Sequence, residues 1–244
     1  MKDKKKDIGF NRKVKASWLR DALHLTASGM PVDEMEETLK KKIAEENPGK
    51  ETIRKVFIYL KRVWMEPPDY CRSLRDDALE MFRKQPSADR SFLLNWGMSM
   101  AAYPFIAHVA EATGRLLRLQ GEAWASQVNL RIREHFGDRH FVYRSVRYNL
   151  STFLDAGALK TGGKPGTYIN SKSYRPKSDT EISWLVESLL HAQDTTTLPF
   201  QGIPQHGALF PFSMEDLSVS VLTRNPRIEI FRHGMNEQLI GLVK

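Results

Sequence analysis

The chain has 244 residues, with 37 lysines and arginines against 29 aspartates and glutamates, and a formal charge of +8 at pH 7. Its hydrophobic fraction of 41% excludes a disordered chain, and its length accommodates one large domain or several small ones. A single cysteine, Cys71, excludes an internal disulfide and a cysteine-rich zinc site. We therefore expect a cytoplasmic protein whose excess of basic residues suits nucleic acid or an anionic membrane surface as partner.

Residues 1–16 form a predicted basic arm. Eight lysines and arginines and two aspartates give the first 20 residues a net charge of +6. Lys4, Lys5 and Lys6 are candidates for a contact with a phosphate backbone, although a solvated terminus has the same composition. The arm leads into no apolar run of the kind that a secretory signal contains, so we expect no such signal.

Residues 17–120 form a predicted helical domain. Apolar residues recur there at spacings of three and four, and turn signals rich in proline and glycine separate the helices. Residues 31–64 predict a helix, a short turn and a second helix that carries Lys50, Arg54 and Lys55. Two helices that merely pack together give this pattern. A helix-turn-helix in which these three side chains make a second DNA contact gives it as well.

The stretch 91–110 contains no Asp, Glu, Lys or Arg and is about as long as a membrane span. Polar residues such as Asn95 would be costly in a bilayer, and Pro104 would interrupt a single helix. We therefore expect one or two buried helices and no membrane partner. His108 is interpreted as a core histidine.

Residues 121–178 predict a winged-helix domain. Helices are expected at 127–136, which Gly137 ends, and at about 140–155. A β-hairpin around a glycine-rich turn follows at 158–170. Helix, turn, helix and hairpin in this order are typical of a winged helix, a fold that also serves as a protein-binding module.

The helix expected at 140–155 has an apolar face and a face of hydrogen-bond donors that suits phosphates and base edges. Between residues 139 and 178 there are eight basic residues and one acid, Asp155. Such a surface should bind a polyanion. The candidate DNA-binding residues are Arg139, Arg144, Arg147, Tyr148, Ser151, Lys160, Lys164, Lys172 and Arg175.

Residues 179–244 predict one further helix and a β extension. The helix runs from Asp179 to Gln193, capped by Asp179 or Thr180, and a loop follows at 198–207. Alternating residues then predict an antiparallel meander with strands at 217–222, 227–231 and 239–243. The expected fold class is therefore mainly α: an N-terminal helical bundle with helix-turn-helix character, a winged-helix domain and a small C-terminal antiparallel β meander.

Motifs for catalysis are missing from the sequence. The chain has no phosphate-binding loop and no nucleophile elbow, and no two histidines have the spacing of a helical zinc site. Asp76 and Asp77 lack the further carboxylate or lysine of a nuclease pattern, and His135 and His140 are interpreted as surface residues near DNA. We expect no catalytic residue, no metal, no cofactor and no enzymatic activity.

The layout resembles the BrxA-like accessory proteins of bacterial BREX phage-exclusion systems. The resemblance covers roughly residues 15–170 and rests on the turn Ala44–Asn47, the helix Thr52–Arg62, the apolar helical region Phe92–Val109 and the segment Arg144–Leu159. It implies a double-stranded DNA-binding protein of antiviral defence, acting beside other defence-system subunits. A winged-helix transcription repressor, a protein-binding scaffold subunit and an RNA-binding antiterminator-like protein are the alternatives that the sequence leaves open.

Overall fold

The computed structural model describes residues 8–233 and 237–243, and the fold is mainly helical, as the sequence predicts. The α-helices are α1 (Ala16–Ala27), α2 (Val32–Glu46), α3 (Lys50–Leu60), α4 (Arg72–Lys84), α5 (Ala88–Ala102), α6 (Pro104–Gln120), α7 (Ala125–Phe136), α8 (His140–Asp155), α9 (Asp179–Ala192) and the short α10 (Val219–Leu222). A π-helical turn, η2 (Lys61–Met65), extends α3, and short 3-10 helices lie at η3 (Asp69–Cys71), η4 (Phe200–Gln205) and η5 (Gly207–Leu209).

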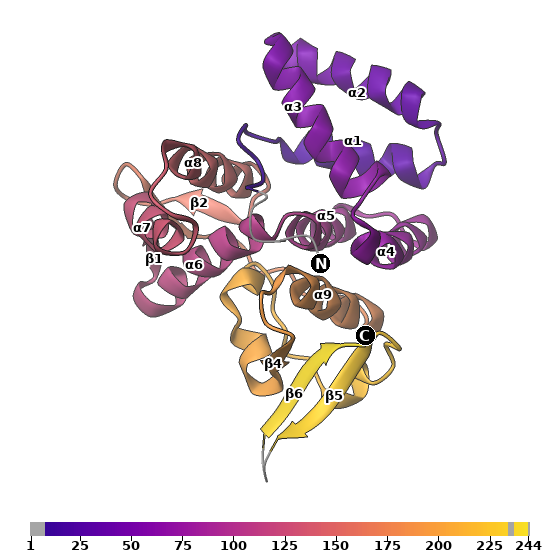
Figure 1. The fold of residues 1–244 in the computed structure, drawn as a ribbon, viewed down its shortest axis with the longest axis vertical. Coiled ribbons are helices and arrows are strands. Elements are labelled where there is room, and N and C mark those ends of the chain that lie inside the picture. Colours follow the sequence, from indigo (N-terminus) through magenta and orange to yellow (C-terminus); the bar gives the residue numbers. More distant parts are fainter. Residues whose placement is uncertain (1–7, 234–236, 244) are drawn as a thin grey trace.

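Helix α5 occupies the middle of the molecule, where it contacts α1, α4, α6 and α9 (Figure 1). It is buried on all sides from Leu93 to Ala102, as expected for a helix with no charged residue in that stretch. The predicted apolar stretch is therefore two buried helices. Pro104 is the first residue of α6, where its missing N–H costs nothing. Among the described residues, no helix is both long enough and apolar enough to cross a membrane.

Two glycines allow neighbouring elements to pack closely in this core. A Cβ at Gly97 of α5 would lie 2.4 Å from the Trp184 ring of α9. A Cβ at Gly114 of α6 would lie 2.1 Å from the carbonyl oxygen of Gly207 in η5. Both contacts are too short for any side chain, so glycine at these positions sets the spacing of the packed elements.

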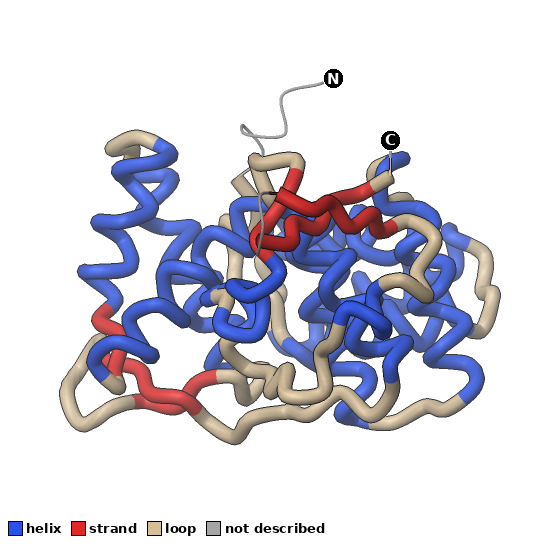
Figure 2. The backbone as a smooth tube through the Cα atoms, turned by 90° about the horizontal axis from the view of Figure 1, so that it is seen from below, coloured by secondary structure: helices blue, strands red, loops and turns tan. Residues whose placement is uncertain are grey.

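The first sheet joins the predicted hairpin to a strand that the sequence did not indicate. Strand β3 (Thr167–Asn170) pairs antiparallel with β2 (Leu159–Thr161) on one edge and with β1 (Glu122–Trp124) on the other. Helices α7 and α8 begin and end close to the predicted residues. Figure 2 shows the two sheets of the molecule as separate groups of strands.

The second sheet differs from the predicted meander. Its strands are β4 (Thr197–Pro199), β5 (Ile228–His233) and β6 (Glu237–Leu242), in the order β4-β6-β5. The strand predicted at 217–222 is wrong, because Ser218 accepts a hydrogen bond from the Val221 N–H and starts helix α10. Strand β4 overlaps the start of the segment predicted as loop, and it forms because β6 supplies its partner.

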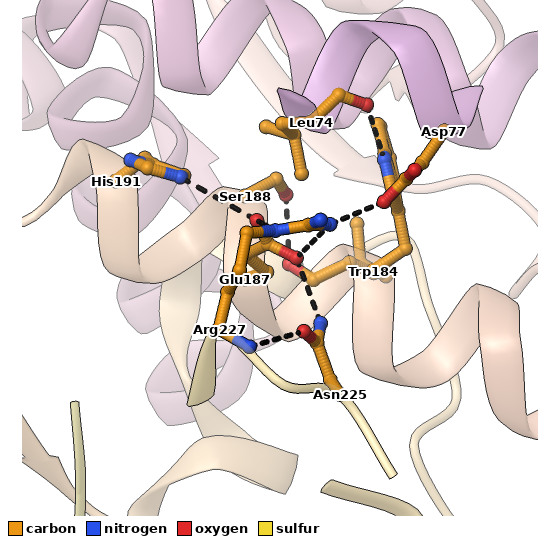
Figure 3. Close-up of polar contacts among 9 residues, drawn as sticks. Leu74, Asp77, Trp184, Glu187, Ser188, His191, Asn225 and Arg227 are labelled. Carbon is orange, nitrogen blue, oxygen red and sulfur yellow. Dashed lines mark hydrogen bonds and ion pairs between the residues drawn. The ribbon is translucent and has the colours of Figure 1, made fainter. Parts of the chain in front are cut away.

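Helix α9 ties this C-terminal part to the helical core. It is capped by Ser178, one residue before the predicted caps, through a 3.2 Å bond from the Glu181 N–H. Further along α9, the buried Glu187 accepts hydrogen bonds from Arg227 and Asn225, and Arg227 also pairs with Asp77 of α4 (Figure 3). The buried side chains form one continuous core from Phe10 to Ile240. The domain boundaries after residues 16, 120 and 178 stay a prediction.

Candidate nucleic-acid interface

Helix α8 presents the face that the sequence proposed for DNA. Its buried side carries an apolar row whose members are Val142, Val146, Leu150 and Phe153. On the other side, Arg144 and Arg147 are exposed and Tyr148 and Ser151 are half-buried. These four side chains and Lys13 line one surface depression of about 230 Å³. The structure thus brings together four of the nine candidate residues, because their spacing of three and four places them on one side of a helix.

The electrostatics of this face are set by cations that lack acidic partners. Among the described residues, neither Arg144 nor Arg147 has an ion pair. The single acid of the face, Asp155, accepts a hydrogen bond from the Ala16 N–H at 2.8 Å and lies 3.1 Å from the Lys13 Nζ. The negative charge at the end of α8 is therefore balanced by the start of the chain, and the rest of the face stays positive.

The hairpin β2–β3 supplies two further exposed cations, Lys160 and Lys164. The turn is closed by the Gly162 N–H donating to the Thr167 carbonyl at 2.8 Å and by the Thr167 hydroxyl donating to the Lys164 carbonyl at 2.6 Å. Gly166 has φ +78°, a conformation that favours glycine. The turn residues thus fix the hairpin tip, with Lys164 on it.

Trp124 belongs to this surface, although the sequence analysis did not single it out. It ends strand β1, and its ring lies 5.6 Å from the Lys164 Nζ, within the range of a cation–π contact. Its indole N–H donates to the Glu122 carboxylate at 2.8 Å. No local signal points to this pairing, because β1 joins the hairpin only through its register with β3.

The Tyr168 phenol on β3 is affected by burial and by the charge of Arg147 on α8. Burial raises the pKa of the Tyr168 phenol, and the positive charge of Arg147 acts in the opposite direction. Helix α8 contacts β2, the other strand of the hairpin. Arg139, which precedes α8, is exposed, and its Nη2 donates to the Phe136 carbonyl at 3.1 Å.

Two of the predicted DNA-binding residues contact other parts of the chain. Arg175 makes two hydrogen bonds to Asp216, at 2.9 and 2.8 Å, and these bonds, with the charge of Asp216, raise the Arg175 pKa. Lys172 lies 3.9 Å from Asp89 at the start of α5, and its Nζ lies 4.6 Å from the Tyr174 ring. The structure therefore places both residues in contacts with other parts of the chain and does not bring them to the depression on α8.

The second candidate set is on α3. Glu51 accepts from Arg54 at 2.9 Å and lies 3.1 Å from the Lys55 Nζ, and hydrogen bonds from these two cations lower its pKa to about 2. Lys50, the first residue of the helix, is exposed. One acid thus offsets part of the positive charge on α3. Lys4, Lys5 and Lys6 lie outside the described residues.

Comparisons with protein-family models, with curated proteins and with solved structures found no match.

Proposed function

We propose that this protein binds double-stranded DNA and that α6 to β3 form a winged helix. Three helices, α6, α7 and α8, a strand order of β1-β3-β2 and a hairpin after the third helix support this proposal. In such an arrangement α8 enters the major groove, and the hairpin reaches the adjacent backbone. Strand β1 pairs with β3 and completes the three-stranded sheet that contains the hairpin.

The observation that carries the proposal is the pair Arg144 and Arg147. Both are exposed on α8, and neither has an ion-pair partner among the described residues. A cation without an acidic partner gains free energy by displacing counterions from a phosphate backbone. Tyr148 and Ser151 beside them supply hydroxyl groups that donate to phosphates or base edges. Lys160 and Lys164 extend the positive surface onto the hairpin.

A double charge reversal, Arg144→Glu with Arg147→Glu, tests this assignment. We expect it to abolish the shift of a short DNA duplex in a gel assay at moderate salt. The matched control is Arg72→Glu with Arg224→Glu, since both arginines are exposed and lie outside α8 and the hairpin, and the two changes alter the net charge equally. Circular dichroism checks that both variants are folded. Equal binding by the wild type and the α8 variant would refute the proposal.

Salt dependence measures the number of phosphate contacts. If Arg139, Arg144, Arg147, Lys160 and Lys164 each neutralise one phosphate, log K should fall against log salt with a slope of about −4.5. The four-site surface left by a single Arg147→Gln change should give a slope of about −3.6. A flat salt profile would contradict the proposed surface.

We infer from the BrxA-like resemblance that this DNA-binding protein is an accessory factor of a bacterial phage-exclusion system. Genes for a methyltransferase and ATPases beside its own gene would support that role. An isolated gene and selection of a palindromic site would favour a transcription repressor instead. Co-purification with partner subunits without any DNA shift would favour a scaffold.

A further inference from the structure

Two histidines and an aspartate from three separate segments meet beside α7. His108 is on α6, His135 is near the end of α7, and Asp194 lies in the segment between α9 and β4. Their ligand atoms all lie within 4.8 Å of one another. No local sequence pattern indicates this group, because its members are distant along the chain. His135, interpreted from the sequence as a surface residue near DNA, is exposed, and its ring lies 4.7 Å from the His108 ring.

The geometry points to a three-ligand site for a divalent transition-metal ion at His108, His135 and Asp194. Asp194 Oδ2 lies 3.2 Å from His135 Nε2 and 3.7 Å from His108 Nε2. In a tetrahedral zinc site with ligands at about 2.0–2.1 Å, two ligand atoms are about 3.3 Å apart. The two observed distances lie on either side of that value. The two imidazole ligand atoms also lie within 4.8 Å of each other, so side-chain rotations can bring all three ligand atoms around one ion.

The donor set selects the kind of ion. Two imidazole nitrogens and one carboxylate oxygen suit zinc, whereas magnesium and calcium prefer oxygen ligands throughout. Three protein ligands leave a fourth position for water. The two imidazole rings, with centroids 4.7 Å apart, are bordered by the Phe136 ring, which lies 5.2 Å from His108 and 4.8 Å from His135. This aromatic wall limits the access of solvent from one side.

Such an ion would connect three segments that are distant from one another along the chain. His135 is on the helix that packs against α8, and Asp194 follows α9 directly before β4. A bound metal would thus attach α7, and with it the surface of α8, to α6 and to the start of the C-terminal sheet. The site is independent of the proposed DNA contacts, because none of its residues belongs to them.

Titration of zinc chloride into the full-length protein, after dialysis against a chelator, tests the site. We expect one ion per chain by isothermal titration calorimetry, and a rise in melting temperature on binding. Cobalt chloride should give the visible absorption of a tetrahedral cobalt site. His135→Ala and Asp194→Asn should each weaken zinc binding by more than the roughly 10- to 100-fold that loss of an outer-shell partner causes.

The control variant is His140→Ala, since His140 is exposed and lies outside the group. It should bind zinc as tightly as the wild type. Circular dichroism without metal establishes that the His135→Ala and Asp194→Asn proteins are folded. Absence of zinc binding by the wild type would overturn the inference. Binding that His135→Ala and Asp194→Asn leave unchanged, or that His140→Ala reduces equally, would also overturn it.

Discussion

Arg227 stabilises the buried carboxylate of Glu187, and the cost of replacing Arg227 can be calculated. The Glu187 side chain is 0% exposed. It accepts from Arg227 Nε at 2.7 Å and Nη2 at 3.0 Å and from Asn225 Nδ2 at 2.7 Å (Figure 3). Burial acts to raise the pKa of Glu187. The hydrogen bonds from His191, Arg227 and Asn225, with the charge of Arg227, outweigh burial and lower that pKa to about 2.

This shift in pKa is a contribution to the free energy of unfolding. The carboxyl pKa falls from 4.5 to about 2 on folding. At 1.36 kcal/mol for each unit, the difference corresponds to roughly 3 kcal/mol. Because the folded pKa is the lower one, the contribution is complete above pH 4.5 and is lost as the pH falls from 4.5 toward 2.

Replacing Arg227 with methionine removes both of its hydrogen bonds to Glu187 and the compensating charge, while the carboxylate stays buried. We expect the free energy of unfolding at pH 7 to fall by about 3 kcal/mol. This is the lower end of the range for breaking a buried ion pair, because the Arg227 side chain is 34% exposed. In the variant, only His191 and Asn225 still oppose burial, so the pKa of Glu187 is higher than in the wild type. Protonation then relieves the penalty, so the loss should be smaller at pH 4 than at pH 7.

Urea unfolding at pH 7 and pH 4, followed by tryptophan fluorescence, measures both values, since Trp184 lies beside this network. The matched control is Arg224→Met, because Arg224 is 69% exposed and pairs with the half-exposed Asp179. An exposed pair contributes less than about 1 kcal/mol. Equal losses for the two variants, or a loss for Arg227→Met that does not depend on pH, would refute the reasoning.

Two further changes probe the packing and the surface. Gly114→Ala should reduce the free energy of unfolding by about 1–3 kcal/mol, because the new Cβ would meet the Gly207 carbonyl oxygen. The control Gly163→Ala should change this free energy by less than about 0.5 kcal/mol, because no atom lies within 4 Å of the new Cβ. Thermal unfolding of both variants compares the two values. Lys164→Ala should weaken DNA binding uniformly across sequences and reduce the salt slope by about 1, as measured by fluorescence anisotropy. Arg175→Ala should leave that slope unchanged, since Arg175 is paired with Asp216.

The helices α1 to α9 could be predicted from the sequence because the pattern of each is encoded locally. Apolar residues at three and four spacing mark the buried face of α8, and its predicted bounds agree with His140–Asp155. Pro104 marks the break between α5 and α6 for an equally local reason. The sequence therefore also predicted that the candidate residues of α8 share one face, because a helix fixes which of its side chains lie on the same side.

The short strands could not be predicted in the same way, since a three-residue strand is defined by its partner. Strand β1 exists through its pairing with β3, and β4 through its pairing with β6, each across a long separation in sequence. In contrast, the alternating residues 217–222 had the pattern of a strand but found no partner. The cap at Ser218 turns part of that segment into a helix. Trp124 and the group at His108, His135 and Asp194 were missed for the same reason, because only the fold brings them together.

The count of charged residues in the sequence overstates the positive surface of the folded protein. Eight basic residues and one acid lie between residues 139 and 178, but the acids that balance several of them come from elsewhere. Asp216 pairs with Arg175, and Asp89 lies 3.9 Å from Lys172. Conversely, Lys13 from the start of the chain offsets Asp155 on α8. The positive surface available to a polyanion is therefore smaller than the charge count suggests. It is centred on α8 and the hairpin, where Arg144 and Arg147 have no ion pair among the described residues and Lys13 offsets Asp155.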